Sequence, residues 1–368
     1  MVRIRRSRFT YFNWILFGLI MFIGIIGILT LYSATGRDLG GQGVPLYAKQ
    51  LIWFLLGLTS LVVLLFIDYR YLEQYGYVIF FLSILMLVYV LLHGRSISGA
   101  KRWIDLGPFQ FQPSEFVKLT FILALAKFFH NDDIKEHYSL LGLRIPILFF
   151  CITFVLVLLQ PDLGTAMILF LVFGSLVVFI GLAKRYIFLM TFLGLLSLPV
   201  GWSFLKDYQK ERILNFLDPS RDPLGSGYHI IQSKIAIGSG GFFGKGFLHG
   251  TQTQLDFIPE QHTDFIFSVL AEEWGFVGTL ILLVSYILLL LWGLDVARNA
   301  KDRFGMVVAL GITFLLFWHV SINIGMGVGL LPVVGVPLPL LSYGGSFLLV
   351  TLVGIGVLIN IHMRRFMF

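Results

Sequence analysis

Residues 12–33 read FNWILFGLIMFIGIIGILTLYS, a stretch of 22 residues without a charged side chain. A helix rises about 1.5 Å per residue, so a stretch of this length crosses the roughly 30 Å hydrocarbon core of a bilayer. The stretch is too long for the apolar part of a signal peptide, and no small-residue cleavage site follows it. It therefore predicts a membrane-spanning helix that stays in the protein.

Similar apolar stretches recur along the whole chain of 368 residues. The chain is 57% hydrophobic and 13% charged, about half the charged content of a soluble globular protein. This composition excludes a soluble enzyme and also a disordered or coiled-coil chain. We predict an all-α polytopic membrane protein with one integral membrane domain, 1–368, and about ten transmembrane helices. The predicted spans are 12–33, 49–67, 76–92, 113–129, 143–160, 163–181, 186–205, 265–294, 304–324 and 345–361.

The distribution of positive charge predicts the orientation of these spans. If both termini are cytoplasmic, fifteen Lys and Arg residues lie at or near the cytoplasmic segments and five in the short outer loops. By the positive-inside rule, this ratio predicts an N-in/C-in topology. Most of the net charge of +7 then lies beside anionic lipid, so we expect no nucleic-acid partner. The single cysteine, Cys151, excludes an internal disulfide.

Three unusual segments fall on the predicted outer side: 93–112, the extracytoplasmic loop 206–264 between predicted helices 7 and 8, and 325–344. Loops of more than about 15 residues are usually functional. The last segment is rich in Gly and Pro, and such irregular backbone at membrane depth must be buried or line a wet cavity. We expect His319 and Asn323, one helical turn apart, to form interhelical hydrogen bonds rather than a ligand set.

Asp264 lies in the stretch PEQHTDFIF (259–267), where the long loop enters the eighth predicted span. One interpretation is helix capping, because Thr263 or Asp264 directly precedes an apolar run. The other is a general base, because a carboxylate at a half-apolar rim can have a pKa suited to proton abstraction. The sequence allows both roles.

Charged residues also lie in GAKRWIDLG (99–107) and QPSEFVK (112–118). Pro113 and Ser114 favour a helix start, with Glu115 in its first turn. Lys118 lies three residues later on the same face. A charged pair just inside a span is costly unless it lines a cavity, so the pair is either a structural ion pair or part of an anion site with Arg102.

Two further motifs are open to a structural interpretation. Asp162, in QPDLGT (160–165), joins two spans almost without a loop and can serve as a turn or N-cap residue. The stretch GSGGFFGKG (238–246) resembles a phosphate loop, but no Ser or Thr follows Lys245 and no strand precedes it. We predict a flexible or close-packed loop there instead.

Five ordered motifs extend over essentially the whole chain: GAKRWIDLG (99–107), QPSE (112–115), QPDLGT (160–165), PEQHTDFIF (259–267) and PLPLLSYGGS (337–346). They resemble the SEDS family (shape, elongation, division and sporulation), which are polytopic bacterial peptidoglycan glycosyltransferases. The stretches GYHIIQSK (227–234) and GFLHGTQ (246–252) are similar to its elongation branch.

The resemblance implies polymerisation of lipid II into glycan strands during cell elongation and rod-shape maintenance. It implies an inverting transfer with Asp264 as the general base. Pyrophosphate leaves readily, so no second carboxylic acid is needed, unlike in glycoside hydrolysis. The candidate substrate- and pyrophosphate-binding residues are Arg102, Lys118, Glu115, Asp162, Lys234, Lys245, His262 and Ser342. No metal site built from protein side chains is expected, although a Mg or Mn ion could bridge the pyrophosphate.

The family also implies partners and a location. The partners are lipid II, a class B penicillin-binding protein transpeptidase, and elongation-complex proteins such as MreC and MreD. The location is the bacterial cytoplasmic (inner) membrane, with an extracytoplasmic active site. Two alternatives from other classes are a flippase for lipid-linked cell-wall precursors and a non-catalytic scaffold for the cell-wall machinery. A flippase favours charges on both faces of a central path, whereas the intramembrane charges here gather toward the outside.

Overall fold

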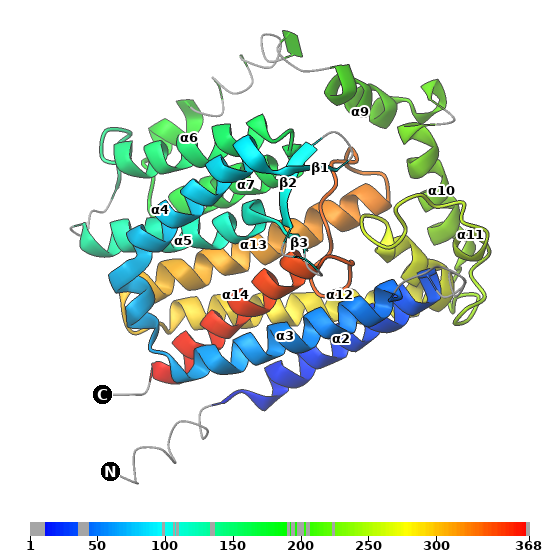
Figure 1. Ribbon diagram of the computed structural model, residues 1–368, viewed down its shortest axis with the longest axis horizontal. Helices are drawn as coiled ribbons and strands as arrows, with labels where there is room; N and C mark the ends of the chain where they lie inside the picture. Colours follow the sequence, from blue (N-terminus) through cyan, green and yellow to red (C-terminus); the bar gives the residue numbers. More distant parts are fainter. Residues whose placement is uncertain are drawn as a thin grey trace.

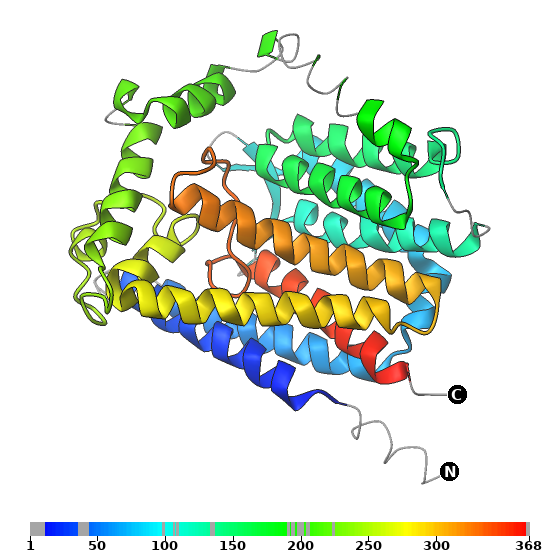
Figure 2. The ribbon, with the colours of Figure 1, turned by 180° about the vertical axis from the view of Figure 1, so that it is seen from behind.

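The computed structural model describes residues 12–35, 44–97, 100–105, 107, 110–132, 137–189, 192, 196, 202–203, 207–222 and 225–365. These residues form a bundle of long helices, with shorter helices gathered at one end (Figure 1). The N-terminal end of α2, the first helix described, and the C-terminal end of α14, the last, lie at the opposite end, as the view from behind also shows (Figure 2). The expectation of an α-helical polytopic membrane protein is therefore confirmed.

Seven of the described helices are long and apolar enough to cross a membrane. Each coincides with a predicted span: α2 (Trp14–Thr35), α3 (Leu46–Phe66), α4 (Tyr69–His93), α7 (Leu163–Ile180), α12 (Ile266–Arg298), α13 (Arg303–Gly327) and α14 (Gly345–Arg364). Helices α13 and α14 are mostly buried, whereas α3 and α4 expose large apolar side chains along their length. Side chains of this kind are stable in contact with lipid, so α3 and α4 lie at the perimeter of the bundle.

The remaining predicted spans have different outcomes. Helix α5 (Pro113–Asn131) begins where its Pro and Ser predicted, and it is buried along most of its length although it carries Glu115, Lys118 and Lys127. Its central place shields these charges from lipid. Helix α6 (Arg144–Leu159) is apolar but shorter than a full span. The predicted span 186–205 lies mostly outside the described residues.

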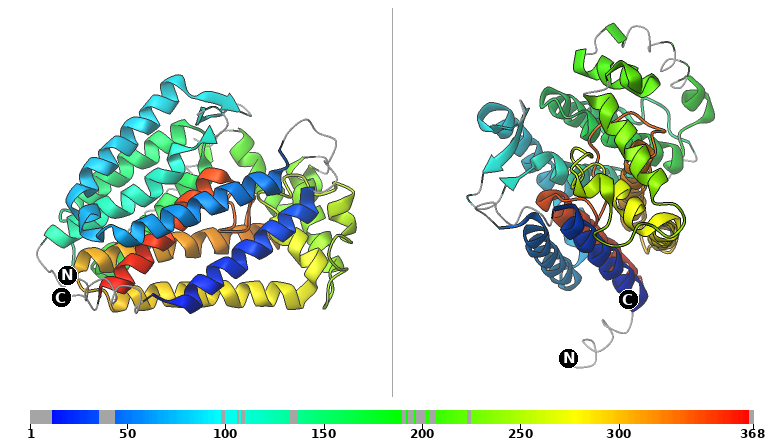
Figure 3. Two further views of the ribbon diagram at one scale, coloured as in Figure 1. Left: turned by 60° about the horizontal axis from the view of Figure 1, so that its bottom comes forward. Right: turned by 90° about the vertical axis from the view of Figure 1, so that its right-hand side faces the viewer.

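Segment 93–112, which was predicted to lie on the outer side, forms a small antiparallel sheet that the sequence did not reveal. Its strands are β1 (Arg95–Ile97), β2 (Ala100–Asp105) and β3 (Gln110–Phe111), in the order β1-β2-β3. Strand β2 contacts α4 and α5, so the sheet closes over one end of the bundle (Figure 3). The loop before α5 is thereby held against the helices.

The long loop 206–264 contains the helices α9 (Asp207–Leu217), α10 (Ser226–Ser239) and α11 (Thr251–Gln254), and the 3-10 turn η1 (Pro219–Arg221). Helix α10 packs on α12, and α11 contacts α2. These elements stand at the same end of the molecule as the small sheet (Figure 1). Of these elements, α9 contributes Arg212 to the wall of the site described below.

Helix α12 is interrupted at Gly275, whose φ is 64°. The glycine-rich loop lies against the last turn before this break, where the Lys245 N–H donates to the Glu272 carbonyl at 3.0 Å. A Cβ on Gly244 would collide with the Glu273 carbonyl. The glycines therefore allow close backbone packing, and the expectation of a close-packed loop is confirmed.

Candidate active site

The structure contains a cavity of about 730 Å³ at the end of the bundle formed by the small sheet and the long loop. Its wall comes from β2, the start of α5, the α6–α7 turn, α9, the loop before α12, and the irregular segment between α13 and α14. Its described polar and charged lining residues are Arg102, Trp103, Gln112, Glu115, Asp162, Thr165, Arg212, Glu260, Thr263, Asp264, His319, Tyr343 and Ser346. The cavity thus joins residues of all five ordered motifs with Arg212 of α9.

Asp264 precedes α12, but it does not cap that helix. The N-cap residue is Phe265, and no described side chain provides a capping hydrogen bond. The capping interpretation is therefore wrong, because the chain turns one residue later than the apolar pattern suggests. The backbone of Asp264 is held instead by Asn323 of α13, whose side-chain amide donates to the Asp264 carbonyl at 2.9 Å. Its carboxyl group lines the cavity.

The electrostatic surroundings favour a base at this position. Burial and, to a lesser degree, the negative charge of Glu260 raise the pKa of Asp264 to about 6, against the opposing effect of Arg212. A carboxyl group with this pKa is mostly ionised at neutral pH and still accepts a proton readily. Asp264 is therefore the acidic residue in the cavity best suited to general-base catalysis.

Asp162 has the predicted structural role and also faces the cavity. Its Oδ1 accepts from the Thr165 N–H at 3.2 Å and so caps α7. Its Oδ2 accepts from the Gln112 side chain at 3.2 Å. Arg102 donates from Nε to the Gln160 carbonyl at 2.9 Å and also to the Pro161 carbonyl. Asp162 and Arg102 thus fix the α6–α7 turn to the loop before α5.

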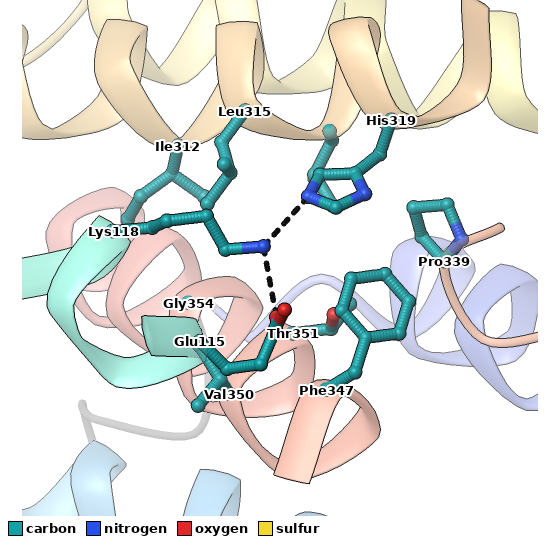
Figure 4. A pocket seen from close by; sticks show the side chains of 11 residues that line it. Glu115, Lys118, Ile312, Leu315, His319, Pro339, Phe347, Val350, Thr351 and Gly354 are labelled. Carbon is teal, nitrogen blue, oxygen red and sulfur yellow. Dashed lines mark hydrogen bonds and ion pairs between the residues drawn. The ribbon is translucent and has the colours of Figure 1, made fainter. Parts of the chain in front are cut away.

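Glu115 and Lys118 form the structural ion pair that was one of the two alternatives. Lys118 Nζ lies 2.8 Å from Glu115 Oε2 and 3.0 Å from His319 Nε2, between helices α5 and α13 (Figure 4). The Phe347 ring lies 5.5 Å from the same ammonium. Glu115 and His319 line the cavity, whereas Lys118 is 2% exposed and is not among the described lining residues. A direct phosphate contact by Lys118 therefore has no support in this geometry.

The irregular segment between α13 and α14 is held by the two polar residues of α13. His319 Nδ1 lies 3.1 Å from the Pro337 carbonyl, and Asn323 donates to the Val336 carbonyl at 2.8 Å. The expected interhelical hydrogen bond is present for His319, which contacts Lys118 of α5 at 3.0 Å, whereas Asn323 bonds to backbone outside the helices. These contacts also explain how irregular backbone is stable here, because it is partly buried and partly lines the cavity.

The other predicted binding residues lie outside the described lining of the cavity. Lys245 pairs with Glu272 at 2.7 Å and stabilises the loop against α12. Lys234 is exposed on α10. Ser342 donates to the Thr263 carbonyl at 2.5 Å, so it fixes the loop that carries Asp264. His262 lies at the rim, 3.8 Å from Glu260 Oε2.

Sequence reasoning missed Arg212, Glu260, Trp103 and Tyr343, which also line the cavity. Glu260 and Trp103 stand inside motifs already singled out, so the motifs contained the signal for them. Arg212 lies in a polar stretch beside Lys210. Which of these cations faces the cavity depends on how α9 is placed, and no local pattern encodes that placement.

Known proteins with similar sequences show the family to which the chain belongs. A family model described as "Cell cycle protein", for FtsW, RodA and SpoVE, matches residues 10–366. The chain is 46% identical over 343 residues to the peptidoglycan glycosyltransferase MrdB of Escherichia coli, which covers 93% of this chain and 90% of that protein. It is 33% identical to the peptidoglycan glycosyltransferase RodA of Treponema pallidum, covering 96% of this chain and 98% of that one.

Solved structures give the same result. One chain, from a peptidoglycan synthase complex that coordinates polymerization and crosslinking, matches with a TM-score of 0.83 and 38% identity, covering 97% of this chain and 99% of that one. The rod shape determining protein RodA of Thermus thermophilus matches with a TM-score of 0.72 and 32% identity, covering 97% and 98%. The chain therefore belongs to the FtsW/RodA/SpoVE family, the SEDS proteins.

Proposed function

We propose that this protein is a peptidoglycan glycosyltransferase that polymerises lipid II during cell elongation and rod-shape maintenance. The observation that carries the proposal is Asp264, a carboxyl group with a raised pKa that lines a polar cavity at one end of a membrane bundle. Peptidoglycan glycosyltransferases with 46% and 33% identity support it. A lipid-linked substrate that stays in the bilayer also accounts for an enzyme built of apolar helices.

The proposed reaction is an inverting transfer. The oxygen of an acceptor sugar hydroxyl attacks the anomeric carbon of the donor, and Asp264 takes the hydroxyl proton. The bond from the anomeric carbon to the phosphate oxygen breaks, and its electron pair leaves with the lipid pyrophosphate. A positioned general base contributes about 10²–10⁴-fold to such a step. Asp162 and Ser342 then act indirectly, because they hold the loops that form the cavity.

We also propose the membrane arrangement and the partners that the sequence implies. The chain has ten spans in an N-in/C-in topology within one integral membrane domain, 1–368, in the bacterial inner membrane. The loop 206–264 and the active site are extracytoplasmic. The proposed partners are a class B penicillin-binding protein, MreC and MreD. A peptidoglycan synthase complex among the similar structures supports the first of these.

A divalent cation is a separate proposal. Within the described part of the chain, no group of three or more His, Cys, Asp or Glu side chains is placed to hold a metal ion. A Mg or Mn ion at the pyrophosphate would take its ligands mainly from the substrate, and the proton transfer to Asp264 does not depend on it.

The decisive experiment compares lipid II polymerisation by the purified protein, Asp264→Asn and the control Asp207→Asn. Asp207 is an exposed acid on α9 that is not among the lining residues. Asp264→Asn should lose about 10²–10⁴-fold in rate, and the control should keep the wild-type rate. Folding raises the pKa of Asp264, so its ionised form opposes folding above its unfolded pKa. Asp264→Asn should therefore melt at the same or a higher temperature at pH 7.5.

Wild-type polymerisation rates in Asp264→Asn would overturn the base assignment. A wild-type protein that moves labelled lipid II across vesicles but forms no polymer would instead support the flippase alternative. Normal rod growth of cells that contain only Asp264→Asn would support the scaffold.

A further inference from the structure

We propose that Arg212 of α9 binds the pyrophosphate of the lipid-linked donor and stabilises the charge that develops on it as it leaves. This inference rests on the proposed function and deepens it by assigning a residue to the leaving group. It replaces the lysines that the sequence suggested for this role. Three observations support it: the placement of the other cations, the place of Arg212 in the cavity, and the chemistry of the guanidinium group.

The first observation is that most cations suggested by the sequence are committed elsewhere. Lys118 lies between Glu115 and His319 and is almost fully buried. Lys245 is paired with the buried Glu272. Arg102 lines the cavity, but it donates to the carbonyls of Gln160 and Pro161. Moving any of them to a phosphate would break contacts that stabilise the fold.

The second observation is that Arg212 lines the same cavity as Asp264. Its charge reaches Asp264, since it lowers the pKa of that carboxyl group against the effect of burial. Helix α9 packs on η1 and α10, and Asn215 of α9 donates to Asp222 at 3.2 Å. Arg212 is therefore presented by a helix of the loop 206–264 to a cavity that motif residues of α5 and α7 also line.

The third observation concerns charge. When the bond between the anomeric carbon and the phosphate oxygen breaks, the diphosphate gains negative charge. A cation placed beforehand at that point stabilises the transition state more than the ground state. Guanidinium suits this task because its planar set of N–H donors can bind two phosphate oxygens at once. The acidic lining, Glu260 and Asp264 included, needs a cation before a diphosphate can enter.

The competing interpretation is that Arg212 serves only as a counter-ion for these acids. The two roles differ in what they predict for phosphate recognition. A diphosphate-binding residue distinguishes undecaprenyl pyrophosphate from undecaprenyl phosphate, whereas a counter-ion does not. If Arg212 were only a counter-ion, the main effect of its loss would be to raise the pKa of the base, Asp264.

The test measures binding of undecaprenyl pyrophosphate and undecaprenyl phosphate to the full chain in nanodiscs, without any turnover. The variants are Arg212→Gln, Arg212→Lys and the control Lys210→Gln, which removes the same charge from the same helix at a position that is not among the lining residues. We expect Arg212→Gln to weaken pyrophosphate binding about 10- to 100-fold, the usual loss for a charge-assisted hydrogen bond. Monophosphate binding should change less. Arg212→Lys should restore part of the loss, and Lys210→Gln should resemble the wild type.

Two results would overturn the inference. One is a wild-type protein that binds both lipids equally. The other is an Arg212→Gln variant that keeps the preference for pyrophosphate and only moves the pH–rate midpoint upward. Binding and polymerisation are measured separately, so the two proposals can fail independently. Loss of pyrophosphate preference in Arg212→Gln, in a protein that forms no polymer, would sustain the binding site and reject the proposed function.

Discussion

In the proposed mechanism, Asp264 is suited to act as a base because of its neighbours. Its ordinary pKa lies far below neutrality, and burial together with the charge of Glu260 raises the pKa to about 6. A base works best when its pKa lies close to the pH at which it operates. The two acids therefore form a functional pair, in which Glu260 tunes the group that takes the proton.

This pairing predicts the pH dependence of polymerisation. The active form of Asp264 is deprotonated, so the rate should rise with pH and reach half its plateau near pH 6. Glu260→Gln removes a negative charge that raises the pKa of Asp264, so the midpoint should move to lower pH. Glu211→Gln, an exposed position on α9, is the control and should leave the midpoint unchanged. A midpoint that stays fixed in Glu260→Gln would show that the two carboxyl groups are not coupled.

The residues of the site differ in how far the sequence could predict them. Motif and position together indicated Asp264 and Asp162, since both stand where a loop meets an apolar run. For the lysines, a sequence shows that a cation is present but not which carboxylate it meets. Lys118 and Lys245 each bind a buried Glu. The sequence could not single out Arg212, because its position in the cavity depends on the placement of α9.

At the scale of elements, the break in α12 is what brings the long loop to the site. Gly275 interrupts the helix, and backbone groups of the glycine-rich loop bond to the last turn before the break. Glu272 strengthens this junction by accepting from Lys245 and from the Gln252 N–H at 2.9 Å. The junction therefore anchors one end of the half-helix whose other end follows Asp264.

Substitution of one glycine tests this junction. Gly244 has a φ of 81°, and a Cβ there would collide with the Glu273 carbonyl. Gly244→Ala should therefore destabilise the protein by about 1–3 kcal/mol, seen as a lower melting temperature by tryptophan fluorescence in detergent. Gly174→Ala is the matched control, because its Cβ meets open space within helix α7. Its melting temperature should be unchanged or slightly higher. Equal melting temperatures for the two variants would contradict the close packing.

The helices themselves were largely predictable, and the reasons are physical. An apolar run of about 20 residues has few alternatives to a spanning helix, because backbone polar groups in lipid must be bonded within the segment. Helices α2, α7 and α14 accordingly begin and end within a few residues of the predicted spans. The small sheet and the helices of the long loop were not predicted, since they depend on contacts with the bundle rather than on local periodicity.

At the scale of the whole molecule, the perimeter helices α3 and α4 expose apolar side chains, whereas the central helix α5 carries buried charges. Glu115, Lys118 and His319 are buried between α5 and α13 (Figure 4), and Glu115 and His319 also line the cavity. Removing one partner of a buried ion pair usually costs more than the pair contributes, because it leaves an uncompensated charge. This cluster therefore stabilises the floor of the site only as a complete set, and it connects the catalytic end to the helices that anchor the protein.

The orientation of the whole molecule gives the last prediction. In the proposed N-in/C-in topology, Leu217 of α9 lies outside the cell membrane and Tyr71, at the start of α4, lies inside. Both side chains are well exposed, at 72% and 57%. The chain has one cysteine, so Cys151→Ser provides a background for Leu217→Cys and Tyr71→Cys. A membrane-impermeant maleimide should label Leu217→Cys in intact spheroplasts and Tyr71→Cys only after the membrane is opened, while Cys151→Ser alone stays unlabelled. The reverse pattern would place the cavity, with Asp264 and Arg212, on the cytoplasmic side, where a polymerase of the extracellular wall could not use it.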